Sequence, residues 1–113
     1  MKIHIKATQL EVTPALAQHI EAKIGSVARL IEKFEREGEC EAFVEVARTT
    51  AHHHKGEVYR AEVNLELLGK VVRAQDTNTD IYAAVDRVKD ILKMEITKYK
   101  DRNSIDKKKI AEA

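Results

Sequence analysis

The chain has 113 residues, of which 35% are charged, and its formal net charge at pH 7 is only +1. This length fits a single domain that can bury a core without disulfides or a structural metal. Its one cysteine, Cys40, excludes an internal disulfide. The first residues lack the apolar run of a secretion signal, and no apolar stretch approaches the roughly 18 residues that cross a bilayer. We therefore expect a cytoplasmic protein without a membrane partner.

The positive charge is concentrated near the C-terminal end of the sequence. Residues 1–86 contain 11 Lys and Arg against 14 Asp and Glu, whereas residues 87–109 contain 9 against 4. Cations gathered on one element favour a polyanionic partner, most often nucleic acid. The charges alone are equally consistent with a solvated helix face.

The first third of the chain predicts a strand followed by a helix. Residues 2–8 alternate apolar and polar side chains, as a half-buried strand does. Thr13 and Pro14 are typical of a helix N-cap and first helical residue, and the apolar stripe after them predicts a helix that ends near Gly38. Gly25 in its middle costs about 1 kcal/mol relative to alanine. Close packing against a neighbour is the expected reason for that glycine, and a left-handed conformation is expected at Gly38.

Three further strands are predicted at residues 41–48, 59–67 and 71–77, where apolar and polar side chains again alternate. Gly69 supplies the positive φ that a tight turn between the last two strands requires. The polar face of these strands is predicted to be largely acidic, with Arg60 as its main cation, and its acidic residues are Glu41, Glu45, Glu62 and Glu66.

Residues 79–102 predict the helix that completes the core. Asn78 and Thr79 offer capping oxygens, and one face carries Ile81, Val85, Val88, Leu92, Ile96 and Tyr99. Tyr82 flanks this apolar stripe, where either core packing or stacking on a base is consistent with the sequence. We expect one domain at residues 1–102 and a short polar, basic tail at 103–113, helical as far as Lys109 at most.

The predicted order β-α-β-β-β-α gives an α+β fold, a two-layer sandwich with a four-stranded sheet and two helices on one face. The open face of the sheet would repel phosphate, and Phe43 is its only obvious aromatic residue. This argues against binding of RNA bases on the sheet. Nucleic acid is therefore predicted to bind the helices.

The predicted binding residues are basic side chains of the two helices. Many cations of the first helix are interleaved with glutamates and are expected to pair with them. In the second helix, Lys89, Lys93 and Lys100 fall in one narrow stripe at about 100° per residue. The full predicted RNA-binding set is Lys23, Arg29, Lys33, Arg87, Lys89, Lys93, Lys98, Lys100 and Arg102.

No arrangement of residues predicts catalysis or a metal site. His52, His53 and His54 are adjacent on a predicted loop, which is a poor geometry for chelation, although neutral imidazole is a common metal ligand. Cys40 lies between two glutamates and lacks the positive surroundings that activate a thiol. We expect no enzyme, no metal and no cofactor.

Residues 56–102 carry a family resemblance. YRAEVNL at 59–65, Gly69, Arg73 followed by alanine, and DIYAAVD at 80–86 match the pattern of the ribosome hibernation promoting factor family, also known as protein Y or the sigma-54 modulation family. LEVTPALAQHIEAKI, starting at Leu10, is similar to the family's first helix. The resemblance covers the chain from about residue 1 to 102.

The resemblance implies the same β-α-β-β-β-α fold, binding in the decoding channel of the small ribosomal subunit, and competition with messenger RNA and with transfer RNA of the A and P sites. It implies a translation inhibitor of stress or stationary phase whose partners are ribosomal RNA and decoding-site proteins. Lys23, Lys98 and Arg102 stand at family-basic positions, whereas Ile91 and Met94 replace cations. The chain ends where longer relatives continue into a dimerisation domain, so a short form that is monomeric when free is expected.

Two other functions remain open at this point. The predicted fold is similar to that of double-stranded RNA-binding domains, so a general duplex-RNA binder is one alternative. The other is a protein-interaction module that uses the acidic sheet face, as the sigma-factor name of the family suggests.

Overall fold

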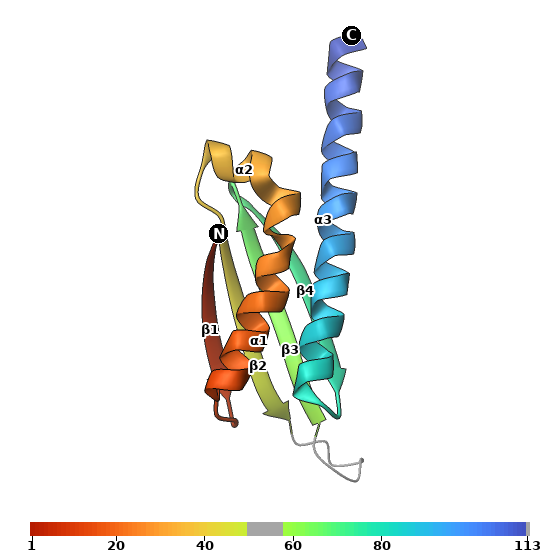
Figure 1. Ribbon diagram of the computed structural model, residues 1–113. Coiled ribbons are helices and arrows are strands. Elements are labelled where there is room, and N and C mark those ends of the chain that lie inside the picture. Colours follow the sequence, from red (N-terminus) through yellow and green to blue (C-terminus); the bar gives the residue numbers. More distant parts are fainter. Residues whose placement is uncertain (50–57, 113) are drawn as a thin grey trace.

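A four-stranded sheet forms one layer of the structure, and two long helical segments form the other (Figure 1). The computed structural model describes the backbone of residues 1–49 and 58–112 and the side chains of residues 1–49 and 58–102. The elements in chain order are β1 Lys2–Thr8, α1 Pro14–Gly25, the 3-10 helix η1 Ser26–Ile31, α2 Glu32–Glu37, β2 Glu41–Thr49, β3 Val58–Leu67, β4 Lys70–Asn78 and α3 Ile81–Glu112.

The strands lie in the order β1-β2-β3-β4, with β1 parallel to β2 and the other neighbours antiparallel. The register places apolar residues opposite one another on one face, because Ala42 pairs with Leu65 and Val44 with Val63. All four of these side chains are at most 3% exposed. One side of the sheet is therefore apolar across its central strands, as the alternation in the sequence predicted.

Both helical segments cover that apolar side (Figure 1). The core consists of the inward strand residues together with Leu16, Ile20 and Ile24 of α1, Val27 and Ile31 of η1, and Ala84, Val85, Val88, Leu92 and Ile96 of α3. Tyr99 packs against this core and contacts Phe34, with ring centroids 5.7 Å apart. The predicted α+β two-layer sandwich is confirmed.

Polar side chains cap the starts of α1 and α3. The Leu16 N–H donates to Thr13 Oγ1 at 3.2 Å, as predicted. At α3 the cap is Asp80, whose Oδ1 accepts the Tyr82 N–H at 2.9 Å, while Asn78 Oδ1 accepts the Asp80 N–H at 3.1 Å. The N-cap of α3 is thus Asp80, one or two residues after the predicted Asn78 and Thr79.

The predicted continuous helix over residues 14–38 is wrong, because η1 interrupts it. Two local causes lie together at the end of α1: Gly25 has a low helix propensity, and the Ser26 hydroxyl donates to the Lys23 carbonyl at 2.6 Å. The expected close packing at Gly25 is also wrong, since a Cβ there would meet nothing within 4 Å.

The two remaining glycine predictions have opposite outcomes. Gly38 has a φ of −179°, which is extended rather than left-handed, and a Cβ there would lie 2.8 Å from Leu68 Cδ2. This contact is with the end of the exposed Leu68 side chain, so a Cβ at Gly38 would require that side chain to move. Gly69 has the predicted positive φ, at +86°.

Helix α3 continues to Glu112, so the residues predicted as a tail are helical beyond Lys109. Figure 1 shows this part of α3 projecting past the end of the sheet and past α2. His52, His53 and His54 lie outside the described residues. None of the described helices combines the length and the apolar character that a membrane span needs.

Alanine substitution at two glycines should change stability in opposite directions. Gly25→Ala is expected to raise the free energy of unfolding by about 0.5–1 kcal/mol, because the backbone is helical and a methyl group fits. Gly69→Ala should lower it by about 1–2 kcal/mol, since its φ is positive. Urea unfolding measures both, and destabilisation by Gly25→Ala would show that the position is packed after all.

Candidate nucleic-acid interface

A polar cluster joins α1 to α3 on the side of the helices that faces away from the sheet. His19 of α1 donates from Nε2 to Asp86 Oδ1 of α3 at 2.8 Å, and Lys23 Nζ lies 3.7 Å from the same oxygen. Tyr82, one turn before Asp86, meets the His19 ring nearly perpendicularly, with centroids 5.0 Å apart. The sequence offered no signal for this cluster, because its two halves are 67 residues apart.

The predicted lysine stripe of α3 borders this cluster. At about 100° per residue, Lys89, Lys93 and Lys100 lie within about 60° of Asp86 around the helix, and Asp86 contacts α1. The stripe therefore follows the side of α3 nearest to α1 and η1. Lys89 pairs with Asp90 at 3.1 Å, whereas Lys93 and Lys100 form no ion pair with any described side chain.

The other predicted cations of α3 lie elsewhere on the helix. Lys98 and Arg102 line a groove of about 160 Å³ between α3 and β4, together with Tyr99 and Arg73. Lys98 pairs there with Glu95 at 3.6 Å. The structure thus divides the predicted set between two flanks of α3. Arg73 is a cation of this groove that the predicted site omitted, although the family match at this position had singled it out.

Most of the predicted cations are unpaired. Ion pairs involve three of them, Lys23, Lys89 and Lys98. Within the described side chains the remaining six have no acidic partner, and these are Arg29, Lys33, Arg87, Lys93, Lys100 and Arg102. The expected pairing of cations and glutamates within the first helix is wrong for the described residues. Lys23 pairs with Asp86 of α3 and Glu35 with the N-terminal amino group of Met1 instead, and η1 changes the angular spacing for pairs that span it.

The open face of the sheet is not the acidic surface that the sequence predicted. The strand register brings Lys2 beside Glu41, Lys6 beside Glu45, and Arg73 beside Asn64. With Arg60, four cations therefore accompany the four glutamates. The prediction was wrong because it left out the lysines of β1 and the arginine of β4, so repulsion of phosphate is not a valid argument against this face.

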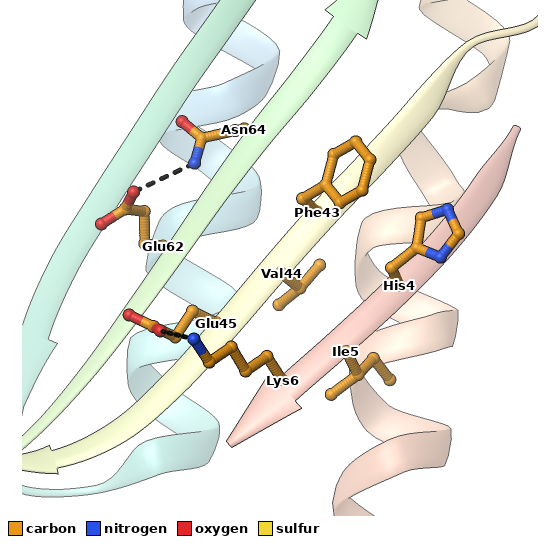
Figure 2. Close-up of a pocket in the computed structure, with 8 residues that line it drawn as sticks. All are labelled: His4, Ile5, Lys6, Phe43, Val44, Glu45, Glu62 and Asn64. Atoms are coloured by element: carbon orange, nitrogen blue, oxygen red, sulfur yellow. Dashed lines mark hydrogen bonds and ion pairs between the residues drawn. The ribbon is translucent and has the colours of Figure 1, made fainter. Parts of the chain in front are cut away.

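The sheet face differs from the helices because each of its four cations forms an ion pair or a hydrogen bond with a neighbouring side chain. Arg60 donates to Glu45 at 2.6 Å and lies 3.7 Å from Glu62. Lys6 pairs with Glu45 at 3.9 Å, as Figure 2 shows. Lys2 pairs with Glu39 at 3.2 Å, and Arg73 Nε donates to Asn64 at 2.7 Å. Phosphate binding here would have to break these contacts, whereas the helix surface offers cations without partners.

A shallow hollow of about 270 Å³ lies on the same open face (Figure 2). The Phe43 ring stacks on the His4 imidazole, with centroids 4.8 Å apart and an angle of 14° between the rings. His4 was missed as an aromatic partner because it comes from β1, the edge strand beside β2. The hollow thus places a stacked aromatic pair beside the charged side chains of Lys6 and Glu45.

The structure supports neither a catalytic cysteine nor a metal site among the described residues. Cys40 is 1% exposed, and burial raises the pKa of its thiol, with the Glu35 carboxylate adding to the rise. A raised pKa lowers the thiolate fraction at neutral pH, the reverse of what a nucleophile requires. Among the described residues no group of His, Cys, Asp or Glu has the arrangement of a metal site.

Comparison with known proteins decides the family. The model of the family described as sigma 54 modulation protein / S30EA ribosomal protein matches residues 3–104, which is most of the chain. The chain belongs to this family. The family resemblance seen in the sequence is thereby confirmed.

The chain is similar to several proteins named ribosome hibernation promotion factor. The one from Lactococcus lactis subsp. cremoris is 34% identical over 103 residues, and the one from Picosynechococcus sp. is 29% identical over 104 residues. These matches cover 90% and 91% of this chain but 51% of each relative. The chain thus spans about half the length of the curated relatives it matches.

Two solved structures share the fold. The crystal structure of the Thermus thermophilus protein Y N-terminal domain has a TM-score of 0.68 and 29% identity, covering 88% of this chain and 99% of that one. A ribosomal subunit interface protein from Coxiella burnetii has a TM-score of 0.67 at 22% identity, covering 89% of this chain and 99% of its own.

The His19–Asp86 contact should couple the two helices energetically. In a double-mutant cycle of His19→Ala and Asp86→Ala, we expect a coupling energy of about 0.5–1.5 kcal/mol in urea unfolding. The cycle of Lys23→Ala with Asp86→Ala is the control and should give a smaller value, because its atoms are 3.7 Å apart. Zero coupling between His19 and Asp86 would contradict this assignment.

Proposed function

We propose that this chain is a ribosome hibernation factor that binds the decoding channel of the small ribosomal subunit and silences translation under stress or in stationary phase. One observation carries the proposal: six of the nine predicted cations have no acidic partner among the described side chains, whereas Lys2, Lys6, Arg60 and Arg73 of the open sheet face all contact neighbouring side chains. A surface of unpaired cations binds phosphate without first breaking ion pairs. The names of the family's relatives supply the ribosome as the partner to test.

The proposed mechanism is steric occupation without chemistry. Cations of α1, η1, α2 and α3 neutralise phosphates of ribosomal RNA, and decoding-site proteins contribute further contacts. The protein then fills the path of messenger RNA and of transfer RNA in the A and P sites, so those ligands compete with it by mass action. No bond is made or broken, and neither a metal nor a cofactor takes part.

Several finer points belong to the same proposal. The free protein is a monomer in the cytoplasm. Met94, which stands where the family has a cation, is 50% exposed and adds no charge to the surface. Lys89 and Lys93 supply charge from neighbouring positions, so the pattern of phosphate contacts differs in detail from that of relatives with a cation at position 94.

A protein-interaction module is the second candidate, because the hollow beside Phe43 and His4 is present on the open sheet face. Partner capture that survives nuclease treatment and lacks ribosomes would favour it. A general duplex-RNA binder is distinguished by competition, since only binding in the decoding channel requires messenger and transfer RNA to displace the protein.

Neutralising the lysine stripe should weaken ribosome binding and its salt dependence. With about five phosphates bound, the slope of log K against log salt is expected to be about −4 for the wild type. The triple variant Lys89→Gln, Lys93→Gln, Lys100→Gln should flatten this slope by about 2 to 3 units. Binding to purified small ribosomal subunits, measured by cosedimentation at several salt concentrations, gives both slopes.

The matched control is Lys2→Gln, Lys6→Gln, Lys70→Gln, which changes the net charge equally but on residues outside the helix surface. Its slope should stay close to that of the wild type. Equal losses in the two triple variants would show that net charge alone drives binding. A wild-type slope near zero would rule out the phosphate mechanism.

A further inference from the structure

Tyr82 lies at the start of the lysine stripe rather than in the core. Its side chain is among the exposed large apolar groups of the described chain, at 37%. At about 100° per residue, Tyr82 falls within about 20° of Lys89, Lys93 and Lys100 around α3. The one large aromatic ring exposed on this helix therefore shares a line with three cations.

The Tyr82 ring is held from one side by a chain of contacts. Asp86 accepts from His19 Nε2 at 2.8 Å, which fixes the imidazole, and the imidazole meets the Tyr82 ring at 76° with centroids 5.0 Å apart. Asp80 caps the backbone of Tyr82 at 2.9 Å. An exposed ring that is fixed in this way loses little conformational freedom when a ligand stacks on it.

We propose that Tyr82 is a stacking platform for an unpaired RNA base, with Asp86 and His19 as its positioning residues. This inference rests on the proposed function and adds that the helix surface recognises an unpaired nucleotide. The base is unpaired because bases within a duplex are stacked on both faces and leave no ring accessible to a side chain.

The charges around Tyr82 favour a base over a phosphate at this point. The carboxylates of Asp80 and Asp86 both lie near Tyr82, and the single ammonium group of Lys23, 3.7 Å from Asp86, offsets only one of them. An anion beside the ring is therefore disfavoured, and a neutral base is not. Lys89 and Lys93 follow at about 10 and 16 Å along the helix axis. The phosphates that follow the stacked base are placed on these ammonium groups. Lys93 is unpaired among the described side chains, whereas at Lys89 the phosphate has to replace the Asp90 carboxylate, 3.1 Å away.

Stacking and phosphate binding differ in their salt dependence, which gives a direct test. Tyr82→Ala and Tyr82→Leu should each weaken binding to purified small ribosomal subunits by about 5- to 150-fold. Neither should change the slope of log K against log salt, because no counterion is released by a stacked base. Tyr82→Phe should stay within about twofold of the wild type, since the ring is retained.

Phe43 provides a control aromatic residue of equal exposure, 38%, on the open face of the sheet. Phe43→Ala should bind as the wild type does. The chain contains no tryptophan, so Tyr82→Trp and Phe43→Trp each introduce a single tryptophan, whose emission can be excited separately from that of the tyrosines. Binding should quench the emission of the first and leave that of the second unchanged. Unfolding midpoints establish that each variant is folded under the assay conditions.

Each of the other outcomes overturns the proposal, and each shows which part of the account is wrong. Wild-type affinity in Tyr82→Ala, with a steep salt slope, excludes stacking and leaves the proposed function standing. Wild-type affinity in Tyr82→Leu excludes recognition of the ring. Loss of binding in Phe43→Ala but not in Tyr82→Ala places the contact on the sheet. A wild-type protein that does not bind small subunits refutes the stacking platform and the proposed function together.

Discussion

Burial of a single apolar face of the sheet under α1, η1 and α3 is the constraint on which the rest of the structure depends. Val88, Leu92 and Ile96 of α3 are fully buried against it, and this fixes the rotation of α3 about its own axis. Once that rotation is fixed, Tyr82 and the lysine stripe must lie along the border with α1. The position of this candidate surface is therefore a geometric consequence of the core.

Net charge is a poor guide to the binding surface of this protein. The two faces differ more in whether their cations form ion pairs than in the sign of their charge. The formal charge of +1 hides two different surfaces. Most predicted cations of the helices are unpaired among the described side chains, whereas on the sheet face Lys6 and Arg60 pair with glutamates and Arg73 donates to Asn64. Unpaired cations keep their hydration and exchange it readily for phosphate. A paired cation must first break its ion pair, and the free energy lost is about as large as the free energy gained from the new contact with phosphate.

The sequence was sufficient for the strands, the Thr13 cap, the turn at Gly69 and the apolar stripe of α3, because these depend on local periodicity and local backbone geometry. It was insufficient for the break at Gly25. There, low helix propensity and a serine hydroxyl bond outweigh a stripe that continues in the pattern. Propensity and periodicity conflicted, and only the structure shows which of the two prevailed.

The candidate site was predictable residue by residue but not as an arrangement. Helical spacing placed Lys89, Lys93 and Lys100 together, yet no local rule relates His19 to Asp86 or brings Arg73 beside Lys98 and Arg102. Contacts of this kind depend on which strands and helices are neighbours. The same reason explains why the lysines of β1 were missed on the sheet face.

The central claim is that the surface formed by α1 and α3, and not the open side of the sheet, meets ribosomal RNA. An electron cryomicroscopy structure of the protein bound to ribosomes from its own organism tests this most directly. We expect density for the protein in the decoding channel, with the line from Tyr82 to Lys100 against the RNA backbone. Density that docks the strands against RNA, or that lies away from the channel, would contradict the account.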